Sequence, residues 1–482
     1  MNWKHLPIFF LLSLPCMTVQ AQQPADGGWD LLACIEYAKS NSLVVSQQKL
    51  NKQESEINLK QARASRFPTI SGGGRYGNSW GRSIDRTTNL FVNQRIQTNG
   101  VFANANMPIF AGMQVNNNIN QANTETNIAE KDLEKSLNDV MLQVTQSYMN
   151  VIFNKELLAN AKDKVATTEK QVDQLEKQYN AGAVAKTELL QMQSTLASNE
   201  AEQIQQENNL RFALLQLQQN MQKPVSTDFD IVVPDINPDK YPWINQTVEQ
   251  VYAMALQTQP EIQAAEERET SALYAMRMAK GALLPSLSLS ASTFTNYSDQ
   301  NLVPIGDEVE VIARSSSIFL DQAGNQPVYQ KFSIPSGEFQ TVGWTKQYSD
   351  NWSNELLLNL SIPIFEGFKR TGDYQRAKIQ QNRAALNAVQ TKNELRQSIE
   401  QAYNDAYSAV KTYDAAQKSV IALEENLRAV QSRFDAGSAN SVEFQIASNS
   451  LFAANTELVR AKYDYVFKLK LLEFYTGQPI TL

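Results

Sequence analysis

The sequence is poor in the side chains from which most catalytic and metal sites are built. Its 482 residues include one histidine, His5, and two cysteines, Cys16 and Cys34. His5 and Cys16 lie in a segment with the pattern of a secretory signal peptide, in which Lys4 precedes an apolar stretch and Ala21 ends a cleavage site. The mature chain then has no histidine and one cysteine. This excludes an internal disulfide, a Cys/His zinc site and a histidine-dependent catalytic triad, so we expect no metal, no cofactor and no enzymatic activity.

Long apolar runs are also missing. No window of 18 consecutive apolar residues follows the signal peptide, so no helix is expected to span a membrane. An exported chain without such a helix is either free in the periplasm or beyond it, or is held in a membrane by strands. The formal net charge of −7 argues against general nucleic-acid binding. Ser13, Leu14 and Pro15 do not form a usual lipid-attachment box before Cys16, so we expect no lipidation there.

Two blocks of the sequence occur twice. Residues 60–71 match residues 277–288 at a spacing of 217, and residues 108–112 match residues 363–367 at a spacing of 255. Self-similarity at this scale predicts two copies of one structural unit. The difference of 38 residues falls in the second copy, after Pro285, and predicts a long surface loop on a hairpin there.

These spacings divide the chain into predicted segments. We expect a signal peptide, a first repeat, a proline-rich equatorial linker and a second repeat, at residues 1–21, 22–224, 225–247 and 248–482. Each repeat is expected to hold a helix, a strand hairpin and a coiled-coil pair. The hairpins are predicted at about 67–110 and 284–365, the coiled coils at 113–222 and 368–477, and the outer loop, which has no clear pattern, at about 298–353.

The segment 113–181 contains neither proline nor glycine and has apolar residues at a sustained period of 3.5 residues. This period is typical of a coiled coil, and it continues for longer than the roughly 25 residues of an ordinary amphipathic helix. At about 1.5 Å per residue the segment would span roughly 100 Å. Two shorter helices, about 31–66 and 186–222, are expected to lie end to end beside it. Gly182 and Gly437 stand where C-cap glycines would end the two long helices.

Four segments beside the repeated prolines alternate apolar and polar residues, as strands do: 67–80, 101–109, 286–293 and 356–362. This alternation is typical of a membrane barrel wall, although the half-buried strands of a soluble sheet share it. Four strands cannot close a barrel, and lipid does not tolerate an open sheet edge. If the strands span a membrane, several chains must therefore share one barrel.

The order of these segments, with Pro-Ile-Phe-x-Gly at 108–112 and 363–367, resembles the TolC-like family of outer-membrane efflux proteins. The resemblance implies an α+β membrane protein. The implied assembly is a homotrimer in which a 12-strand β-barrel, four strands from each chain, is continued by a long α-helical coiled-coil barrel.

The resemblance also implies a place and a function. The chain would lie in the outer membrane of a Gram-negative bacterium and extend into the periplasm, where it docks with a periplasmic adaptor protein and an inner-membrane transporter. It would serve as the exit duct of a tripartite efflux or type I secretion system, with a role in multidrug resistance. A periplasmic coiled-coil adaptor (membrane fusion) protein is the alternative, but adaptors carry one hairpin rather than two copies in register.

The turns between the long helices suggest a gate. Glu188 and Glu443 occupy equivalent places at the spacing of 255. Three chains would bring up to six such carboxylates to one level, and a ring of this kind favours cations. The alternative is that each stabilises the N-terminal dipole of its helix. Ile446 and Ala439 stand where the family pattern has a second carboxylate and an arginine, so we do not expect the family's salt-bridge lock. Small residues in the same turns are the predicted adaptor contacts: Gly182, Ala183, Val184, Gly437 and Ser438.

Overall fold

The computed structural model describes residues 28–84, 91–93, 95–234, 246–319, 327–335 and 337–478. The predicted signal peptide, Cys16 and the middle of the predicted linker lie outside the described residues. The chain divides into two compact units. We call them the helical unit (Met1–Glu56, Thr124–Glu269 and Arg383–Leu482) and the sheet unit (Ile57–Asn123 and Thr270–Asn382).

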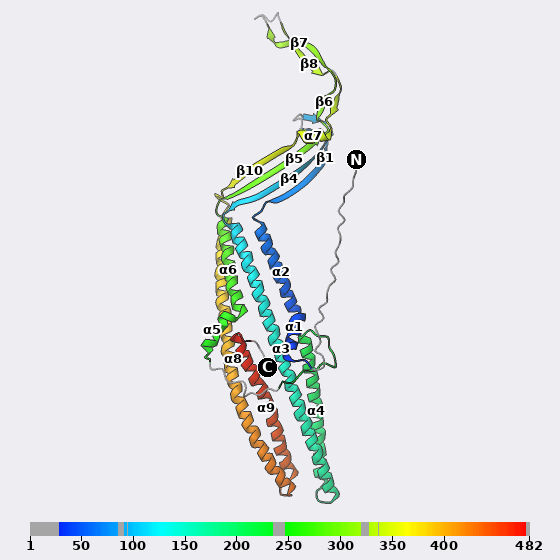
Figure 1. Ribbon diagram of the computed structural model, residues 1–482, viewed down its shortest axis with the longest axis vertical. Coiled ribbons are helices and arrows are strands. Elements are labelled where there is room, and N and C mark those ends of the chain that lie inside the picture. Colours follow the sequence, from blue (N-terminus) through cyan, green and yellow to red (C-terminus); the bar gives the residue numbers. More distant parts are fainter. Residues whose placement is uncertain are drawn as a thin grey trace. The chain divides into compact units, whose positions relative to one another are not determined.

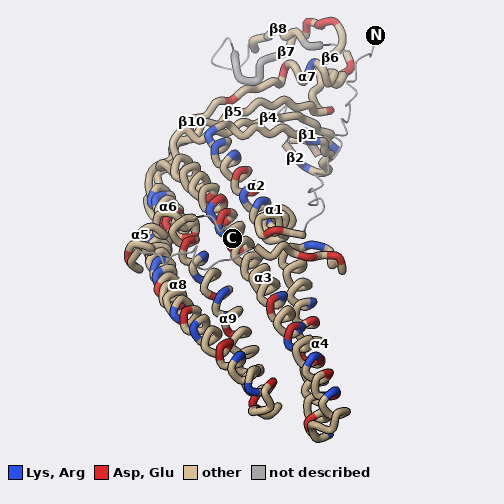
Figure 2. The backbone as a smooth tube through the Cα atoms, turned by 60° about the horizontal axis from the view of Figure 1, so that its bottom comes forward, with Lys and Arg blue, Asp and Glu red and all other residues tan. Residues whose placement is uncertain are grey.

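Two long helices and their return helices occupy the segments predicted as coiled coils (Figure 1). They are α3 (Gln114–Asn180), α4 (Lys186–Asn220), α8 (Lys369–Asp435) and α9 (Ser441–Tyr475). The long helices have 67 residues each and the return helices 35 each, and corresponding ends are 255 residues apart. Lys and Arg are interspersed with Asp and Glu along these helices (Figure 2), as expected for surfaces in contact with water.

The helix predicted over 31–66 is broken, which corrects the prediction of one continuous helix. Its two parts are α1 (Leu31–Asn41) and α2 (Leu43–Ala64), and the second half of the chain has α5 (Val248–Thr258) and α6 (Pro260–Gly281). Ser42 is extended, with φ −61° and ψ 126°. Gln259 is extended as well, because the ring of Pro260 disfavours helical backbone at the residue before it. Ser42 precedes Leu43 rather than a proline, so the break in the first half had no such sequence signal.

The four predicted strands are present and form one antiparallel sheet in the order β1–β4–β5–β10. Their bounds are β1 (Thr69–Ser79), β4 (Ile96–Ala111), β5 (Ser286–Ser298) and β10 (Ser353–Ser361). Strands β4 and β5 pair in the middle, although they are far apart in the sequence. Strands β1 and β10 are therefore the two edges of this sheet.

The segment predicted as a loop at about 298–353 has structure of its own, which the sequence did not indicate. It contains β6 (Leu302–Pro304), β7 (Glu308–Phe319), β8 (Pro327–Pro335), β9 (Phe339–Thr341) and the short helix α7 (Trp344–Asp350). The buried Gln347 anchors α7, since its amide donates to Ser298 O at 2.9 Å and to Val342 O at 2.7 Å. A smaller hairpin, β2 (Arg82–Ile84) with β3 (Phe91–Asn93), extends the first half.

The largest core lies in the helical unit, where α1, α3, α4 and α9 contribute buried side chains. Tyr148 is buried there, and its hydroxyl lies 2.5 Å from Val232 O and 3.2 Å from Trp29 O. It thereby ties the segment before α1 to the segment after α4. Cys34 is fully buried in the same core, and burial raises the pKa of its thiol to about 12. Burial also raises the pKa of Tyr148. Among the described helices, none has a stretch long and apolar enough to cross a membrane.

Candidate functional site

The four-stranded sheet has one apolar face. Side chains alternate between faces along a strand, and the registers bring apolar residues of neighbouring strands opposite one another. Ala105 lies opposite both Ile70 and Ala291, and Leu358 lies opposite Leu289. We call this surface the apolar sheet face, and it consists of Ile70, Tyr76, Val101, Ala103, Ala105, Met107, Leu287, Leu289, Ala291, Leu356, Leu358 and Leu360. Ile70 is 76% exposed and Leu356 70%, so this face has no cover within the described chain.

The opposite face of the sheet is mainly polar. Ser290 donates to Asn106 Oδ1 at 3.2 Å and accepts from Asn359 Nδ2 at 3.3 Å, which links β4, β5 and β10. Ser292 donates to Glu355 Oε2 at 3.3 Å on the same face. An apolar face and a wettable face on one sheet are what the wall of a strand-built pore requires.

Each half of the chain turns from its strand region into its long helix through an elbow with a left-handed backbone. Gly112 and Met113 have φ 57° and 64°, and Gly367 and Phe368 have φ 58° and 65°. Left-handed backbone at Met113 and Phe368 costs about 1–2 kcal/mol each, so both elbows hold the same strained geometry. Gly112 has no room for a side chain, because a Cβ atom there would lie 2.1 Å from Gly281 O. Apart from Gly367 and its two chain neighbours, no described atom lies within 4 Å of the corresponding position at Gly367.

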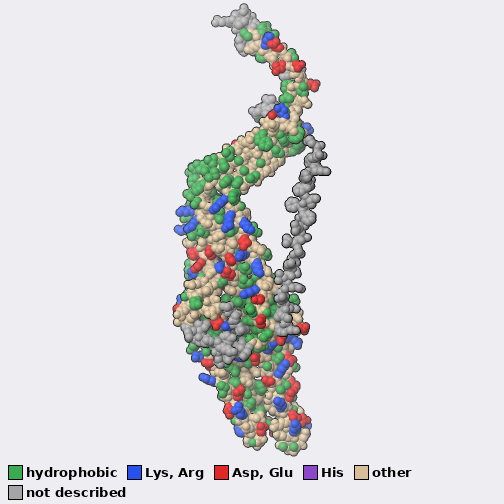
Figure 3. All heavy atoms as spheres, in the orientation of Figure 1, with side chains coloured by type: hydrophobic (Ala, Val, Ile, Leu, Met, Phe, Trp, Pro, Cys, Tyr) green, Lys and Arg blue, Asp and Glu red, His purple; other side chains and the backbone are tan. Residues whose placement is uncertain are grey.

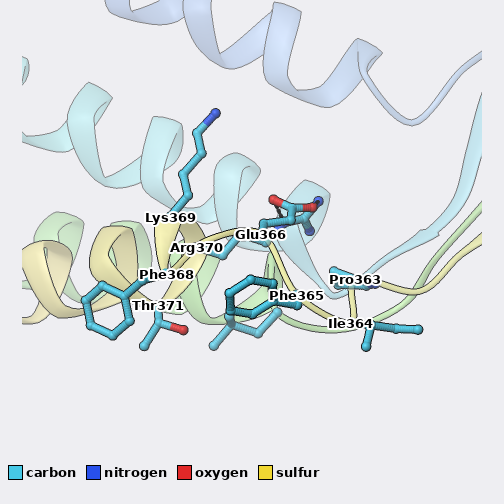
Figure 4. A pocket seen from close by; sticks show the side chains of 9 residues that line it. Pro363, Ile364, Phe365, Glu366, Phe368, Lys369, Arg370 and Thr371 are labelled. Carbon is cyan, nitrogen blue, oxygen red and sulfur yellow. Dashed lines mark hydrogen bonds and ion pairs between the residues drawn. The ribbon is translucent and has the colours of Figure 1, made fainter.

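A pocket of about 160 Å³ adjoins the second elbow (Figure 4). Phe365 and Ile364 lie on one side of it, and Lys369 extends away from them. Arg370 and Glu366 face each other with a nitrogen–oxygen distance of 2.8 Å, and Arg370 also donates to Ala282 O. The pair fixes the start of α8 against the end of α6.

The turns between the long and return helices have the predicted glycine caps. Gly182 and Gly437 have φ 77° and 75°. The amide of Ala183 donates to Gln178 O and that of Ser438 to Arg433 O, both at 2.8 Å, as in a Schellman motif. The two turns, with the predicted contact residues Gly182, Ala183, Val184, Gly437 and Ser438, therefore share one backbone geometry. Their role as adaptor contacts stays a prediction.

The two predicted gate carboxylates lie in the first turns of α4 and α9 but have different surroundings. Glu443 lies 3.2 Å from Arg433 Nη2, and Asn440 caps the same helix by accepting the Glu443 amide at 2.8 Å. Gln178 and Ala185 stand at the equivalent places of the first turn, and no described cation lies within 4 Å of the Glu188 carboxylate.

Arg433 is the residue that sequence reasoning missed. It stands one turn before Gly437, and the contact with Glu443 requires α8 and α9 to pack as an antiparallel pair. A basic residue in the last turn of the long helix was the available signal. Over the part of the chain that the structure describes, no group of three or more metal-ligating side chains is assembled.

Comparison with known proteins agrees with this geometry. Residues 34–221 and 251–478 match the family model described as outer membrane efflux protein. The chain is 20% identical to the outer membrane protein TolC of Escherichia coli over 96% of this chain and 84% of TolC. It is 21% identical to the outer membrane efflux protein BepC of Brucella suis over 77% of this chain and 71% of BepC.

Solved structures share the fold at low identity. The outer membrane protein VceC of Vibrio cholerae is similar with a TM-score of 0.71 and 15% identity, over 93% of this chain and 96% of VceC. The outer membrane channel CmeC of Campylobacter jejuni is similar with a TM-score of 0.72 and 17% identity, over 93% of this chain and 85% of CmeC. The family model covers most of the sequence, and the chain belongs to the outer membrane efflux protein family.

Proposed function

We propose that three copies of this chain form one continuous exit duct. Their sheets close a 12-strand barrel in the outer membrane, and their helices form a coiled-coil barrel in the periplasm. The observation that carries this proposal is a sheet with an uncovered apolar face and two edges, β1 and β10. Lipid would cover the face, but unpaired edge groups cost several kcal/mol each in lipid and need strands of other copies.

The pairing between copies follows from the pairing within one. Asn104 of β4 lies opposite Ser292 of β5. If β4 corresponds to β10 at the spacing of 255, and β5 to β1 at 217, then Asn359 lies opposite Arg75 of the next copy. Both residues are on the polar face, so this register keeps the two faces of the sheet continuous around the ring.

The elbows support the same arrangement. Gly281 fills the space at Gly112, and Ala64 is the equivalent of Gly281 at the spacing of 217. The open space at Gly367 would then receive Ala64 of the next copy. Exposure agrees with this, since Phe110 is 42% exposed beside the first elbow while Phe365 is 86% exposed beside the second.

The duct would receive its cargo from an inner-membrane transporter through a periplasmic adaptor, in tripartite efflux or in type I secretion. Relatives of both kinds support this range. BepC is named an efflux protein, and AprF of Pseudomonas aeruginosa, 24% identical over 147 residues, is named an alkaline protease secretion protein. Small molecules and polypeptides are therefore the candidate cargo, and the chain acts as a passage rather than as an enzyme.

The proposed repeats are residues 22–224 and 248–482, joined by the linker 225–247. At their periplasmic turns, Glu188 and Glu443 form the proposed gate. Arg433 partly neutralises Glu443, so Glu188 supplies most of the negative charge of the ring. The small residues of the same turns would let helices of the adaptor approach closely.

The mass of the detergent-solubilised complex from purified outer membranes tests the proposal. We expect about three times the mass of the mature chain, with migration in gels that changes on heating. A monomer recovered from the soluble periplasm would contradict the proposal and favour the adaptor function.

A further inference from the structure

Positive charge gathers where the helices of the sheet unit meet the sheet. The four segments at this level are 57–67, 112–123, 270–284 and 363–382. Together they hold nine of the chain's 43 Lys and Arg residues and two of its 50 Asp and Glu residues. We call the nine basic residues the basic collar: Lys60, Arg63, Arg66, Arg277, Lys280, Lys369, Arg370, Arg376 and Lys378. A collar of this sign is unexpected in a chain with a net charge of −7.

Most of the positive charge of the collar is not neutralised by carboxylates of the described chain. Its two acidic residues are already paired, Glu366 with Arg370 and Asp373 with Arg376. The ammonium groups of the four collar lysines, by contrast, have no described carboxylate within 4 Å, and all four side chains are exposed: Lys60, Lys280, Lys369 and Lys378. Exposed like charges held at one level repel one another, so an anionic partner would stabilise them.

The collar adjoins the apolar sheet face within the same unit. Figure 3 shows hydrophobic side chains over the sheet and, directly below them on the same face of the molecule, a group of Lys and Arg side chains. The far end of the sheet has a different charge balance. The segment 299–352, which joins β5 to β10, holds seven acidic and three basic residues, whereas the segment 80–95, which joins β1 to β4, holds one acidic and three basic residues. The excess of positive charge is therefore greatest at the end of the sheet beside the long helices.

We propose that the basic collar binds the headgroups of anionic phospholipids in the periplasmic leaflet of the outer membrane, while their acyl chains cover the apolar sheet face. The inference rests on the proposed membrane barrel. A barrel that spans the membrane with its apolar sheet face places the collar at the depth of the lipid phosphates. Lys and Arg near an anionic membrane surface are each worth about a fivefold increase in affinity, and lysine stems can lie along apolar surface while their ammonium groups reach the phosphates.

The test is native mass spectrometry of the purified complex after incubation with an equimolar mixture of dioleoylphosphatidylglycerol and dioleoylphosphatidylethanolamine. We expect wild-type protein to retain phosphatidylglycerol in preference to phosphatidylethanolamine. The collar variant Lys60→Gln, Lys280→Gln, Lys369→Gln, Lys378→Gln should lower the ratio of anionic to zwitterionic lipid retained by at least about fivefold. The preference should also weaken at 1 M salt, where the screening length is about 3 Å.

A matched control removes the same charge elsewhere. Lys49, Lys162, Lys170 and Lys418 are exposed lysines outside the collar, and their replacement by Gln should leave the ratio unchanged. An equal loss in collar and control variants, or an unchanged ratio in the collar variant, would overturn the proposal. So would a collar variant that keeps its lipid preference but loses permeability to anions, because the lysines would then line the lumen.

The same spectra report the mass of the complex. A wild-type monomer would refute the proposed trimeric barrel, whereas a trimer without lipid preference would refute the lipid site alone.

Discussion

Gly112 packs against Gly281, whereas no described atom outside Gly367 and its two chain neighbours lies within 4 Å of where a Cβ atom would stand on Gly367. The φ angles of the two elbows agree to within about a degree, so these angles do not explain the difference. Ile109 beside the first elbow is 50% exposed and Ile364 beside the second is 93% exposed. This unequal exposure of equivalent residues is what the proposed trimer predicts, because a neighbouring copy would cover the second elbow.

The turns show the opposite relation. There it is the second half that has an internal partner, in the contact of Glu443 with Arg433, while Glu188 of the first half has none among the described residues. The halves therefore share lengths and backbone geometry and differ in side-chain chemistry. The predictions below test which of these differences have consequences.

The largest effect is expected at the elbows. Gly112→Ala combines left-handed strain with a clash against the backbone of Gly281, which together should destabilise the protein by about 3–5 kcal/mol. Gly367→Ala adds about 1–2 kcal/mol of strain within the chain, but it should also weaken the trimer. Yield in outer membranes and the urea midpoint of the assembled protein measure the first effect, and the ratio of trimer to monomer measures the second. Equal behaviour of the two variants would remove the asymmetry on which the elbow argument depends.

The buried thiol of the first half should make stability depend on alkaline pH. Burial keeps the Cys34 thiol neutral in the folded protein up to a pKa of about 12, whereas a thiol in the unfolded chain has its ordinary pKa of about 9. The unfolded state loses this proton first, so stability should fall as pH rises from about 9 to 12, by on the order of 3 kcal/mol.

Cys34→Val is the matched variant, because Val251 stands at the equivalent place of the second half and is also fully buried. The urea midpoints of wild type and variant should diverge with pH across this window in favour of the variant. A difference that stays constant from pH 7 to 11 would contradict the prediction.

A smaller effect on stability is expected from the hydrogen bonds of the Tyr148 hydroxyl in the first half. Tyr148→Phe removes the hydroxyl between Trp29 O and Val232 O and leaves buried carbonyls without this donor, at a cost of about 1–3 kcal/mol. The urea midpoint measures this loss, and Tyr76→Phe, at an exposed tyrosine of the sheet, serves as the control. If both variants unfold at the same urea concentration, the hydroxyl does not stabilise the connection of α1 to the segment after α4.

The smallest effect on stability, below about 1 kcal/mol, is expected at the turns, because the ion pair of Arg433 and Glu443 is exposed. Its consequence should appear in ion selectivity. Glu188→Gln should lower cation selectivity more than Glu443→Gln does, and Arg433→Gln should raise it. Reversal potentials across a KCl gradient in planar bilayers distinguish these variants. Equal shifts for the two glutamates would mean that Arg433 does not modulate the ring.

The sequence was informative wherever a pattern was local and repeated. The 3.5-residue period located α3 and α8 to within a residue or two, the absence of proline and glycine marked α3 as one continuous helix, and Gly182 and Gly437 marked the ends of the two helices. The strands followed from alternation beside the repeated prolines.

The features that the sequence did not predict depend on tertiary contacts. The break at Ser42 precedes no proline, and the strands within 298–353 require partners that alternation alone does not identify. The contact between Arg433 and Glu443 joins residues of two helices, and its geometry depends on how those helices pack. The four strands, in contrast, could be predicted from the sequence. Because four strands cannot close the proposed barrel, they also predicted an oligomer.

Disulfide formation between β10 and β1 tests this central claim most directly. In a Cys34→Val background, the pair Arg75→Cys and Asn359→Cys should cross-link copies into trimers on a non-reducing gel and into nothing larger. Within one chain, β1 and β10 are separated by two strands and so by roughly 14 Å, too far for an internal disulfide. The pair Arg75→Cys and Ser353→Cys, displaced by six residues or about 20 Å along the strand, should remain unlinked. Monomers from the first pair, or equal cross-linking from both, would contradict the shared barrel and its register.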